Sequence, residues 1–220
     1  MSERSAVQNP MIRYASEIGW VRILQADALT LRGGESGLFF TDLLRERLLY
    51  LNPGIVDEGR ADGIIRQLSL LRPDISGNRD ALTWLRGEQS VFVPEERRER
   101  NVRLIDFETP GNNLYHVTDE WTQRNARCAN RADVVFLING IPVAICETKN
   151  AGKPDGVAIG IDQVRRYHRE TPEMLIAPQA FEVTQLLDFY YGATWSTARK
   201  NLFNWKEDQP GDYESAVKSF

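Results

Sequence analysis

Apolar residues recur every three to four positions through the first third of the chain, which is the pattern of helices that bury one face. The first such stripe stops at Gly19, and a longer one stops at Asn52-Pro53-Gly54, both typical helix ends. None of these helices carries side chains with an evident chemistry, so they predict a helical elaboration that packs against another part of the protein. The predicted helices span residues 11–18, 38–51, 57–71 and 80–87.

Near residue 90 the pattern changes to short β-strands. The strongest predictions are residues 132–138 and 141–149, which are apolar on both faces, as central strands are, and are joined by the hairpin signal Asn139-Gly140. Weaker strands are predicted at 90–93, 102–107 and 113–121. A helix over 156–170 ends before Pro172, and 174–176 and 182–187 are predicted as later strands or short helices. This order indicates an α/β or α+β core.

The same patterns divide the chain into three parts. Residues 1–89 are predicted to be a helical N-terminal elaboration packed on the core, and residues 90–205 to be the core itself. Residues 206–220 are polar and rich in turn formers, so we expect a linker or a truncated end that leads to a further domain.

Composition excludes several classes of protein. With 27 Lys and Arg against 31 Asp and Glu, the net charge is −4, which argues against a protein that coats nucleic acid but not against a nuclease, whose metal site is itself acidic. No apolar run is long enough to span a bilayer, and no signal peptide is visible. Cys128 and Cys146 form no metal-binding spacing and are expected to be reduced thiols. We therefore expect a cytoplasmic globular protein without membrane partners.

Candidate chemistry lies at the end of the strand over 141–149. Side chains alternate along a strand, so three apolar residues share one face with Glu147 and Lys149. Asp133 lies on the preceding strand and can meet them across the hairpin. Burying a charged pair at the end of a strand costs free energy, so such a pair indicates a functional role. An isolated Glu-x-Lys is nevertheless expected by chance about once in a chain of this length.

Whether Asp133 faces Glu147 depends on the register of the hairpin. A two-residue turn at Asn139-Gly140 places Asp133 opposite Cys146 and therefore on the other face. A three-residue loop, with Gly140 in the left-handed bulge position, brings Asp133 to the face of Glu147. We predict this three-residue loop, or else a bend at Asp133 that re-aims its side chain.

If these groups converge, they form a site for phosphodiester hydrolysis. Two carboxylates supply the hard oxygen ligands that Mg²⁺ prefers, and Mn²⁺ can substitute for it. The metal polarises the phosphoryl group and lowers the pKa of a bound water, while Lys149 holds that water or offsets charge in the transition state. Gln163 and Tyr167 lie four positions apart on the following helix and so share a face. An isolated pair of this kind is more often a solvated Gln and a half-buried Tyr.

The order and spacing of these elements resemble a known family. Asp133-Val-Val-Phe-Leu-Ile-Asn-Gly-Ile-Pro-Val-Ala-Ile-Cys-Glu147-Thr148-Lys149, followed by Gln163-x-x-x-Tyr167, resembles the nuclease domain of the restriction (R) subunit of type I restriction–modification enzymes. That family belongs to the PD-(D/E)xK superfamily, and its Q-x-x-x-Y element is shared with RecB-type nucleases. The resemblance implies a restriction-endonuclease-like core, a central mixed sheet flanked by helices.

The resemblance assigns a role to each residue of the motif. It implies that Asp133 and Glu147 are metal ligands, with the Thr148 carbonyl as a third, and that Lys149 is the catalytic lysine. Gln163 and Tyr167 are expected beside the site, where they position DNA or active-site groups.

One further acidic residue is expected on the opening helix of this family. Gln8 stands at that position in this chain, and Glu17 and Glu120 are the available substitutes. His116 is expected to be structural.

The resemblance also implies substrates and partners. Members cleave duplex DNA in complexes with methyltransferase (M) and specificity (S) subunits, and they continue into an ATP-driven motor. This chain has no G-x-x-x-x-G-K-[ST] loop, so ATP is expected only for the missing motor domain. Two alternatives stay open: a catalytically degenerate nuclease fold that serves as a DNA-binding or assembly module, and a related repair nuclease.

Three clusters of arginines are candidates for contacts with DNA. The cluster at residues 165, 166 and 169 lies on the same predicted helix as Gln163 and Tyr167, so it is placed to grip backbone phosphates near the site. A solvated face is an equally good interpretation of the first cluster, which is interleaved with glutamates. The other two clusters are residues 97, 98, 100 and 103, and residues 124, 127 and 131.

Overall fold

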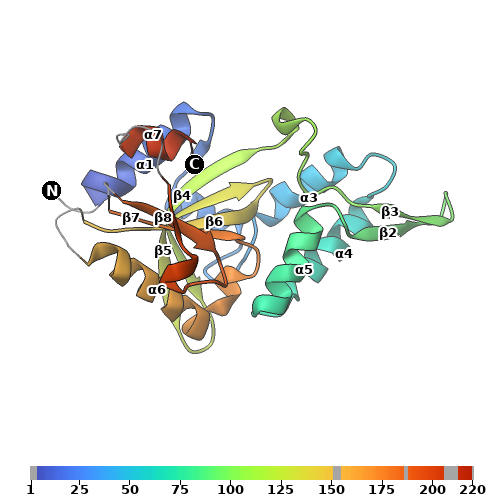
Figure 1. The fold of residues 1–220 in the computed structure, drawn as a ribbon. Helices are drawn as coiled ribbons and strands as arrows, with labels where there is room; N and C mark the ends of the chain where they lie inside the picture. Colours follow the sequence, from blue (N-terminus) through green and yellow to red (C-terminus); the bar gives the residue numbers. More distant parts are fainter. Residues whose placement is uncertain (1–3, 151–154, 186–187, 206–212, 220) are drawn as a thin grey trace.

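The fold is built on a mixed seven-stranded sheet in the order β1-β4-β5-β6-β7-β8-β9 (Figure 1). The computed structural model describes residues 4–150, 155–185, 188–205 and 213–219. The pairs β1–β4 and β6–β7 are parallel, and the other neighbours are antiparallel. This confirms the predicted α/β class, and the two most apolar strands lie at the centre. The strands are β1 (Val21–Ile23), β4 (Tyr115–Arg124), β5 (Ala129–Ile138), β6 (Ile141–Thr148), β7 (Ala180–Thr184), β8 (Phe189–Ala193) and β9 (Phe203–Asn204).

Helices cover both faces of the sheet (Figure 1). On one face lie the π-helical turn η1 (Arg4–Gln8), α1 (Asn9–Glu17) and α7 (Tyr213–Ser219), whose apolar side chains pack with Val134 and Cys146 of the sheet. On the other face lies α6 (Gly156–Glu170), which packs against Val135 and Ile145. The predicted helix over 156–170 is confirmed. The two layers place β5 and β6 between apolar surfaces, which explains why both strands are apolar throughout.

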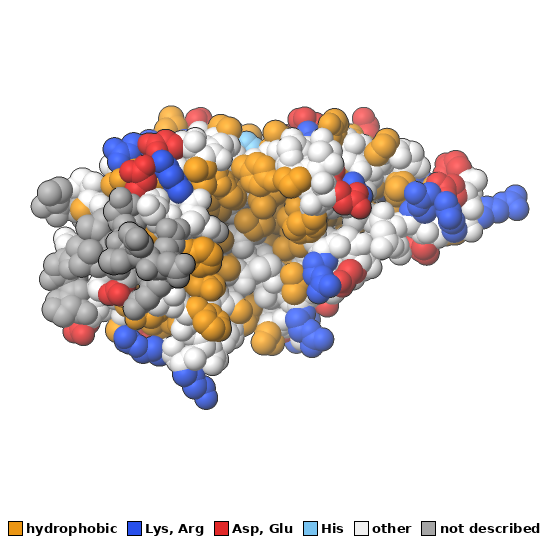
Figure 2. Space-filling view, turned by 45° about the horizontal axis from the view of Figure 1, so that its top comes forward, with side chains coloured by type: hydrophobic (Ala, Val, Ile, Leu, Met, Phe, Trp, Pro, Cys, Tyr) orange, Lys and Arg blue, Asp and Glu red, His pale blue; other side chains and the backbone are white. Residues whose placement is uncertain are grey.

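A lobe projects from the edge of this sandwich (Figure 1). It has its own core, which includes Leu44, Ile64 and Trp84 and which also contacts Ile141 of β6. Figure 2 shows hydrophobic side chains gathered on one face between the sheet and the lobe, and charged side chains at the lobe's far end. The lobe consists of α3 (Thr41–Leu51), α4 (Glu58–Ser69), α5 (Ile75–Leu85), β2 (Ser90–Val93) and β3 (Arg98–Asn101), and α2 (Gln25–Leu31) connects it to β1.

The first 89 residues therefore do not form one helical unit. Helix α1 and strand β1 belong to the sheet, whereas the β2–β3 hairpin, expected in the core, lies with the helices of the lobe. Strand β1 was not predicted because it has three residues and no buried face. Of the predicted linker, residues 206–212 lie outside the described residues, and residues 213–219 form α7, which buries Tyr213 and Val217 against α1.

The strand predicted over 102–107 is wrong. This segment is irregular, although Val102 and Leu104 are buried in the lobe, so their alternating burial imitates a strand. Side chains supply hydrogen-bond partners for its backbone. The Asp106 carboxylate accepts from the backbone N–H groups of Glu108 and Thr109, and the Asn113 side chain accepts from the backbone N–H of Asp106. Local side-chain bonds of this kind compete with a strand ladder. The 3₁₀ turns are η2 (Pro110–Asn112), η3 (Pro172–Leu175) and η4 (Arg199–Asn201).

The hairpin between β5 and β6 differs from the prediction in its turn. Ile138 pairs with Ile141, so Asn139 and Gly140 alone form the turn. Both have positive φ, 53° and 83°, as a type I′ turn requires. A Cβ on Gly140 would lie 2.9 Å from the Phe40 carbonyl oxygen, so only glycine fits. The predicted three-residue loop is therefore wrong.

A β-bulge in β6 changes the register instead. The extra residue is Val143, because Leu137 pairs with Pro142 and the next pair is Phe136 with Ala144. Proline has no N–H to donate to the ladder, and within sheets it is tolerated at bulges. Beyond the bulge, Val135 pairs with Ile145 and Val134 with Cys146. The next pair in this register is Asp133 with Glu147, so the two carboxylates share a face.

Alternation also breaks beside Asp133. Glu120 of β4 has φ 56°, a left-handed conformation that is uncommon for a non-glycine residue. On β5, Ala132 packs in the same cluster as Val135, although a regular strand would direct them to opposite faces. This irregularity supports the second possibility drawn from the sequence, a bend at Asp133.

None of the helices in the described part of the chain is long and apolar enough to cross a bilayer.

Candidate active site

The structure brings Asp133, Glu147 and Lys149 together at the ends of β5 and β6. The ammonium Nζ of Lys149 lies 3.2 Å from Glu147 Oε2 and 3.5 Å from Asp133 Oδ2. Asp133 Oδ2 is further held by the Thr148 backbone N–H at 2.8 Å and by the Thr148 hydroxyl at 3.1 Å. All four residues are buried. Because both carboxylates reach the same ammonium, one cation can contact both.

Three oxygen atoms surround the Lys149 ammonium. The third belongs to the backbone carbonyl of Thr148, which accepts from Nζ at 2.7 Å. They belong to the three residues that the family resemblance implies as metal ligands, and here they enclose a positive charge. In the described residues no group of three His, Cys, Asp or Glu side chains could hold a metal. The candidate ligand set is therefore two carboxylates and one carbonyl oxygen.

Helix α6 supplies the pair that orients Glu147. The Tyr167 hydroxyl lies 2.6 Å from Glu147 Oε1 and 2.6 Å from the Arg131 carbonyl oxygen, and it accepts from Gln163 Nε2 at 2.9 Å. A hydroxyl has one proton, so Tyr167 donates to only one of these two oxygens at a time. Tyr167 is fully buried, and Gly160, about two helical turns before it, lets α6 lie close to Val183 of the sheet. The predicted shared face of Gln163 and Tyr167 is thus turned toward Glu147.

Burial of Glu147 shifts its protonation. Desolvation raises the pKa of this carboxyl to about 8, and the neighbouring charge of Asp133 acts in the same direction. Lys149 and the Tyr167 hydroxyl oppose the shift without cancelling it. When Glu147 is protonated, its carboxyl can donate to the Tyr167 hydroxyl, which then donates to the Arg131 carbonyl oxygen. Each of the two protons therefore has an acceptor. Burial also raises the pKa of Tyr167, which keeps its hydroxyl proton.

The acid expected on the opening helix is absent from the site. Gln8 is buried there, and its amide donates to Glu120 Oε1 at 3.1 Å and to the Asp133 carbonyl oxygen at 3.0 Å. Glu120 is therefore the nearer of the two substitutes, and it forms an ion pair with Arg131. Glu17 pairs with Lys218 at 2.5 Å on α7 instead.

His116 lies away from the site. It is on β4 opposite Leu137 and packs edge-on against Phe40, as a structural histidine does.

An open groove of about 520 Å³ leads to Asp133 between β5 and α6. We call it the β5–α6 groove. Sequence reasoning did not identify Asn130 or Glu170, because their place beside the site depends on contacts between distant segments. The groove is lined by Thr122, Ala129, Asn130, Arg131, Asp133, Gln163, Arg166 and Glu170.

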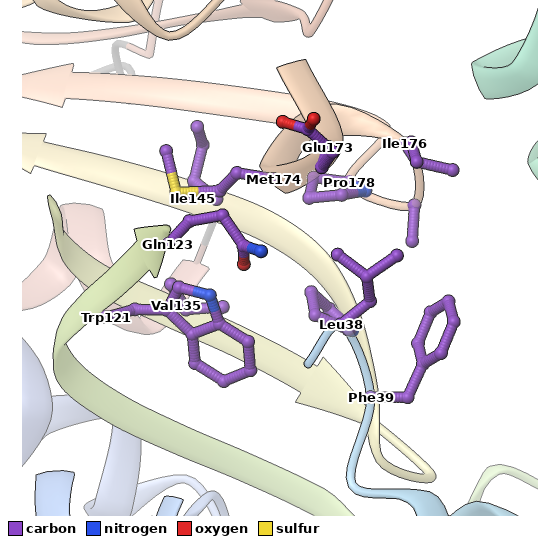
Figure 3. A pocket seen from close by; sticks show the side chains of 12 residues that line it. Leu38, Phe39, Trp121, Gln123, Val135, Ile145, Glu173, Met174, Ile176 and Pro178 are labelled. Atoms are coloured by element: carbon purple, nitrogen blue, oxygen red, sulfur yellow. The ribbon is translucent and has the colours of Figure 1, made fainter. Parts of the chain in front are cut away.

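A second hollow is unsuited to a substrate. It lies between the sheet, the segment at Leu38 and Phe39, and the chain around Met174, and its lining is mostly apolar (Figure 3). Its volume is about 10 Å³, room for no more than a single water. The β5–α6 groove is the candidate substrate site, because its lining includes Asp133 and Gln163.

Comparisons with known proteins show what the chain is similar to. The family model for the N terminus of the type I restriction enzyme R protein matches residues 1–197. The chain is 28% identical over 161 residues to the type I restriction enzyme HindI endonuclease subunit of Haemophilus influenzae, covering 70% of this chain and 15% of that protein. It is 30% identical over 119 residues to the EcoprrI endonuclease subunit of Escherichia coli, covering 51% and 36%. It thus spans a minor part of the length of these relatives.

Proposed function

The chain belongs to the family of type I restriction enzyme R protein N termini, and from this premise we propose that it is a metal-dependent endonuclease domain that hydrolyses phosphodiester bonds of duplex DNA. The observation that carries the proposal is the convergence of Asp133, Glu147 and the Thr148 carbonyl on one cation, the Lys149 ammonium. A catalytically degenerate fold has no need to keep this arrangement buried and complete.

The donor set fits Mg²⁺, with Mn²⁺ as a substitute. Carboxylate and carbonyl oxygens are the ligands that these hard cations prefer, and a positive charge is already stable at their centre. When bound, the ion supplies polarisation of the phosphoryl group and a water of lowered pKa. Asp133, Glu147 and Thr148 would hold it, and Glu147 would do so as the ionised carboxylate.

The remaining residues orient the reacting groups. The Lys149 ammonium occupies the place of the ion in this structure, and once displaced by the ion it would hold the attacking water and offset negative charge that develops on the phosphoryl oxygens. Tyr167 fixes the Glu147 carboxyl by its hydroxyl, and Gln163 fixes Tyr167. Tyr167 and Gln163 are positioning residues, because they act through Glu147.

The assembly of the whole protein is inferred from the family to which the chain belongs. The matched proteins are endonuclease subunits much longer than the matched region. We infer that this domain works in a longer subunit whose motor region uses ATP, in complex with methyltransferase and specificity subunits. Its duplex DNA substrate would place it in the cytoplasm.

Cleavage of a supercoiled plasmid in Mg²⁺ or Mn²⁺ tests the proposal. The wild-type chain is expected to nick or linearise the plasmid, and EDTA to stop it. Asp133→Asn is expected to be about 100-fold slower or worse, because a lost metal ligand removes several kcal/mol of transition-state stabilisation. Asp162→Asn, on the exposed side of α6, is the control. Cleavage that resists EDTA, or Asp133→Asn at the wild-type rate, would refute the proposed function.

A further inference from the structure

Two arginines flank Asp133 in the β5–α6 groove, one from each wall. Arg131 lies two residues before Asp133 on β5, and Arg166 immediately precedes Tyr167 on α6. We propose that this groove binds the sugar–phosphate backbone of duplex DNA, with Arg131 and Arg166 each contacting a phosphate on either side of the bond presented to Asp133. This inference rests on the proposed function and assigns the surface that delivers the substrate.

Arg131 is fixed to the candidate site by its backbone, and its side chain is partly exposed. Its carbonyl oxygen contacts the Tyr167 hydroxyl, so any shift of Arg131 also moves the residue that orients Glu147. Its guanidinium pairs with Glu120, yet the side chain is 55% exposed. Glu120 is buried and held in a left-handed conformation in the middle of β4. Strain of this kind persists where the surrounding structure imposes it, often at functional sites.

Arg166 lies on the other wall and is held by a side-chain hydrogen bond. Its Nε donates to Asn130 Oδ1 at 2.9 Å, and Glu170 lies 3.8 Å away, beyond hydrogen-bond distance. Guanidinium has five donor hydrogens, so most remain available for a phosphate. The side chain is 46% exposed. Asn130 is itself fixed by Glu170 at 3.0 Å, which pre-orients the arginine without neutralising it fully.

The neighbouring arginines of α6 do not share this position. Successive residues of a helix point about 100° apart. Arg165 therefore lies on another side, where it pairs with Asp162 at 2.8 Å and donates to the Thr197 carbonyl oxygen at 2.8 Å. Arg165 and Arg169 do not line the groove. Of the cluster predicted from the sequence, only Arg166 reaches the groove, and Arg131 joins it from a different cluster.

Charge explains why the groove needs these two residues. A phosphate that approaches Asp133 and Glu147 meets two carboxylates in a chain whose net charge is −4. The planar guanidinium group of arginine can form two parallel hydrogen bonds to the oxygens of one phosphate. Both arginine side chains are about half exposed, and the pair of Arg166 with Glu170 is exposed at both ends, where ion pairs contribute little. A phosphate can therefore reach the unused guanidinium donors of both arginines.

The test measures duplex binding by fluorescence anisotropy in Ca²⁺, in place of Mg²⁺, over a range of salt concentrations. Each phosphate contact contributes about 0.9 to the slope of log K against log salt. Arg131→Gln and Arg166→Gln are each expected to lower that slope by about 1, and the double variant by about 2. Arg165→Gln removes the same charge from the same helix and is expected to keep the wild-type slope. Arg131→Lys retains the charge and is expected to keep it too.

The outcomes separate this inference from the proposed function. Equal slopes for Arg166→Gln and Arg165→Gln, or no binding of the wild-type chain at low salt, would overturn the groove assignment, and plasmid cleavage by the wild type would still support the nuclease. Arg166→Gln is the safer variant, because the carboxylate partner Glu170 is partly exposed, whereas Arg131→Gln leaves the buried Glu120 without its ion pair. Thermal unfolding of each variant checks that the fold is intact. A reduced slope with no cleavage in Mn²⁺ would support the groove and refute the nuclease.

Discussion

Lys149→Ala is expected to slow plasmid cleavage by about 10² to 10³-fold while it binds Mn²⁺ at least as tightly as the wild-type chain. Loss of one preorganised donor to the transition state has an effect of this size. Metal affinity is expected to hold or rise because the Lys149 ammonium contacts the same three oxygen atoms that the metal needs. Removal of the ammonium leaves those oxygens without a competing cation.

The same variant changes stability in a metal-dependent way. Without metal, Lys149→Ala leaves Asp133 and Glu147 with a lost partner in a buried site, so the free energy of unfolding is expected to fall. The fall is limited, because Glu147 can take up a proton. Mn²⁺ is expected to restore stability. Isothermal titration calorimetry and thermal unfolding measure both effects, and Lys200→Ala, exposed on η4, is the control. Weaker Mn²⁺ binding by Lys149→Ala would show that the ammonium does not stand in the metal's place.

Mn²⁺ affinity is expected to rise about tenfold for each pH unit as the pH increases toward 8, and to level off above pH 8. Glu147 is protonated in the metal-free site because its pKa is about 8, whereas a metal ligand must be ionised. Binding therefore releases about one proton. Calorimetry in buffers of different ionisation enthalpy counts that proton directly. Glu147→Gln is expected to lose Mn²⁺ binding, because the amide supplies no negative charge.

Glu182 provides a matched control for this prediction. It is buried as fully as Glu147, and desolvation raises its pKa to the same value of about 8, but it lies against Cys146 on the face covered by α1 and α7. Both carboxyls have a raised pKa in the fold, so their contribution to metal-free stability is greatest below the usual carboxyl pKa of 4.5 and is lost as the pH rises to about 8. Glu182→Gln is expected to reduce this fall and leave the pH dependence of Mn²⁺ binding unchanged. Mn²⁺ affinity that is flat between pH 5 and 8 would contradict the assignment of Glu147.

The local part of the site was predictable from the sequence. Alternation along β6 places Glu147 and Lys149 on one face, and the spacing of Gln163 and Tyr167 places both on one side of α6. The hairpin was predictable from Asn139-Gly140, since the two residues tolerate positive φ. These features depend on neighbours within a few residues, which is the range over which sequence patterns act.

The bulge at Val143 had a signal that the prediction did not use. Pro142 stands inside a strand that is otherwise central, and a proline there indicates a bulge because it cannot donate to the ladder. The left-handed conformation of Glu120 had no such signal. It depends on Gln8 and Arg131, which are distant in sequence and meet it only in the folded chain. The groove between β5 and α6 could not be predicted for the same reason.

Anomalous scattering from crystals of this chain soaked in Mn²⁺ tests the central claim most directly. Mn²⁺ accepts the same oxygen ligands as Mg²⁺ and can be located by its own signal. The account predicts one peak bound by Asp133, Glu147 and the Thr148 carbonyl, with the Lys149 ammonium displaced from these three oxygens. No peak there at a pH above 8, with Lys149 still seated among the same oxygens, would contradict it.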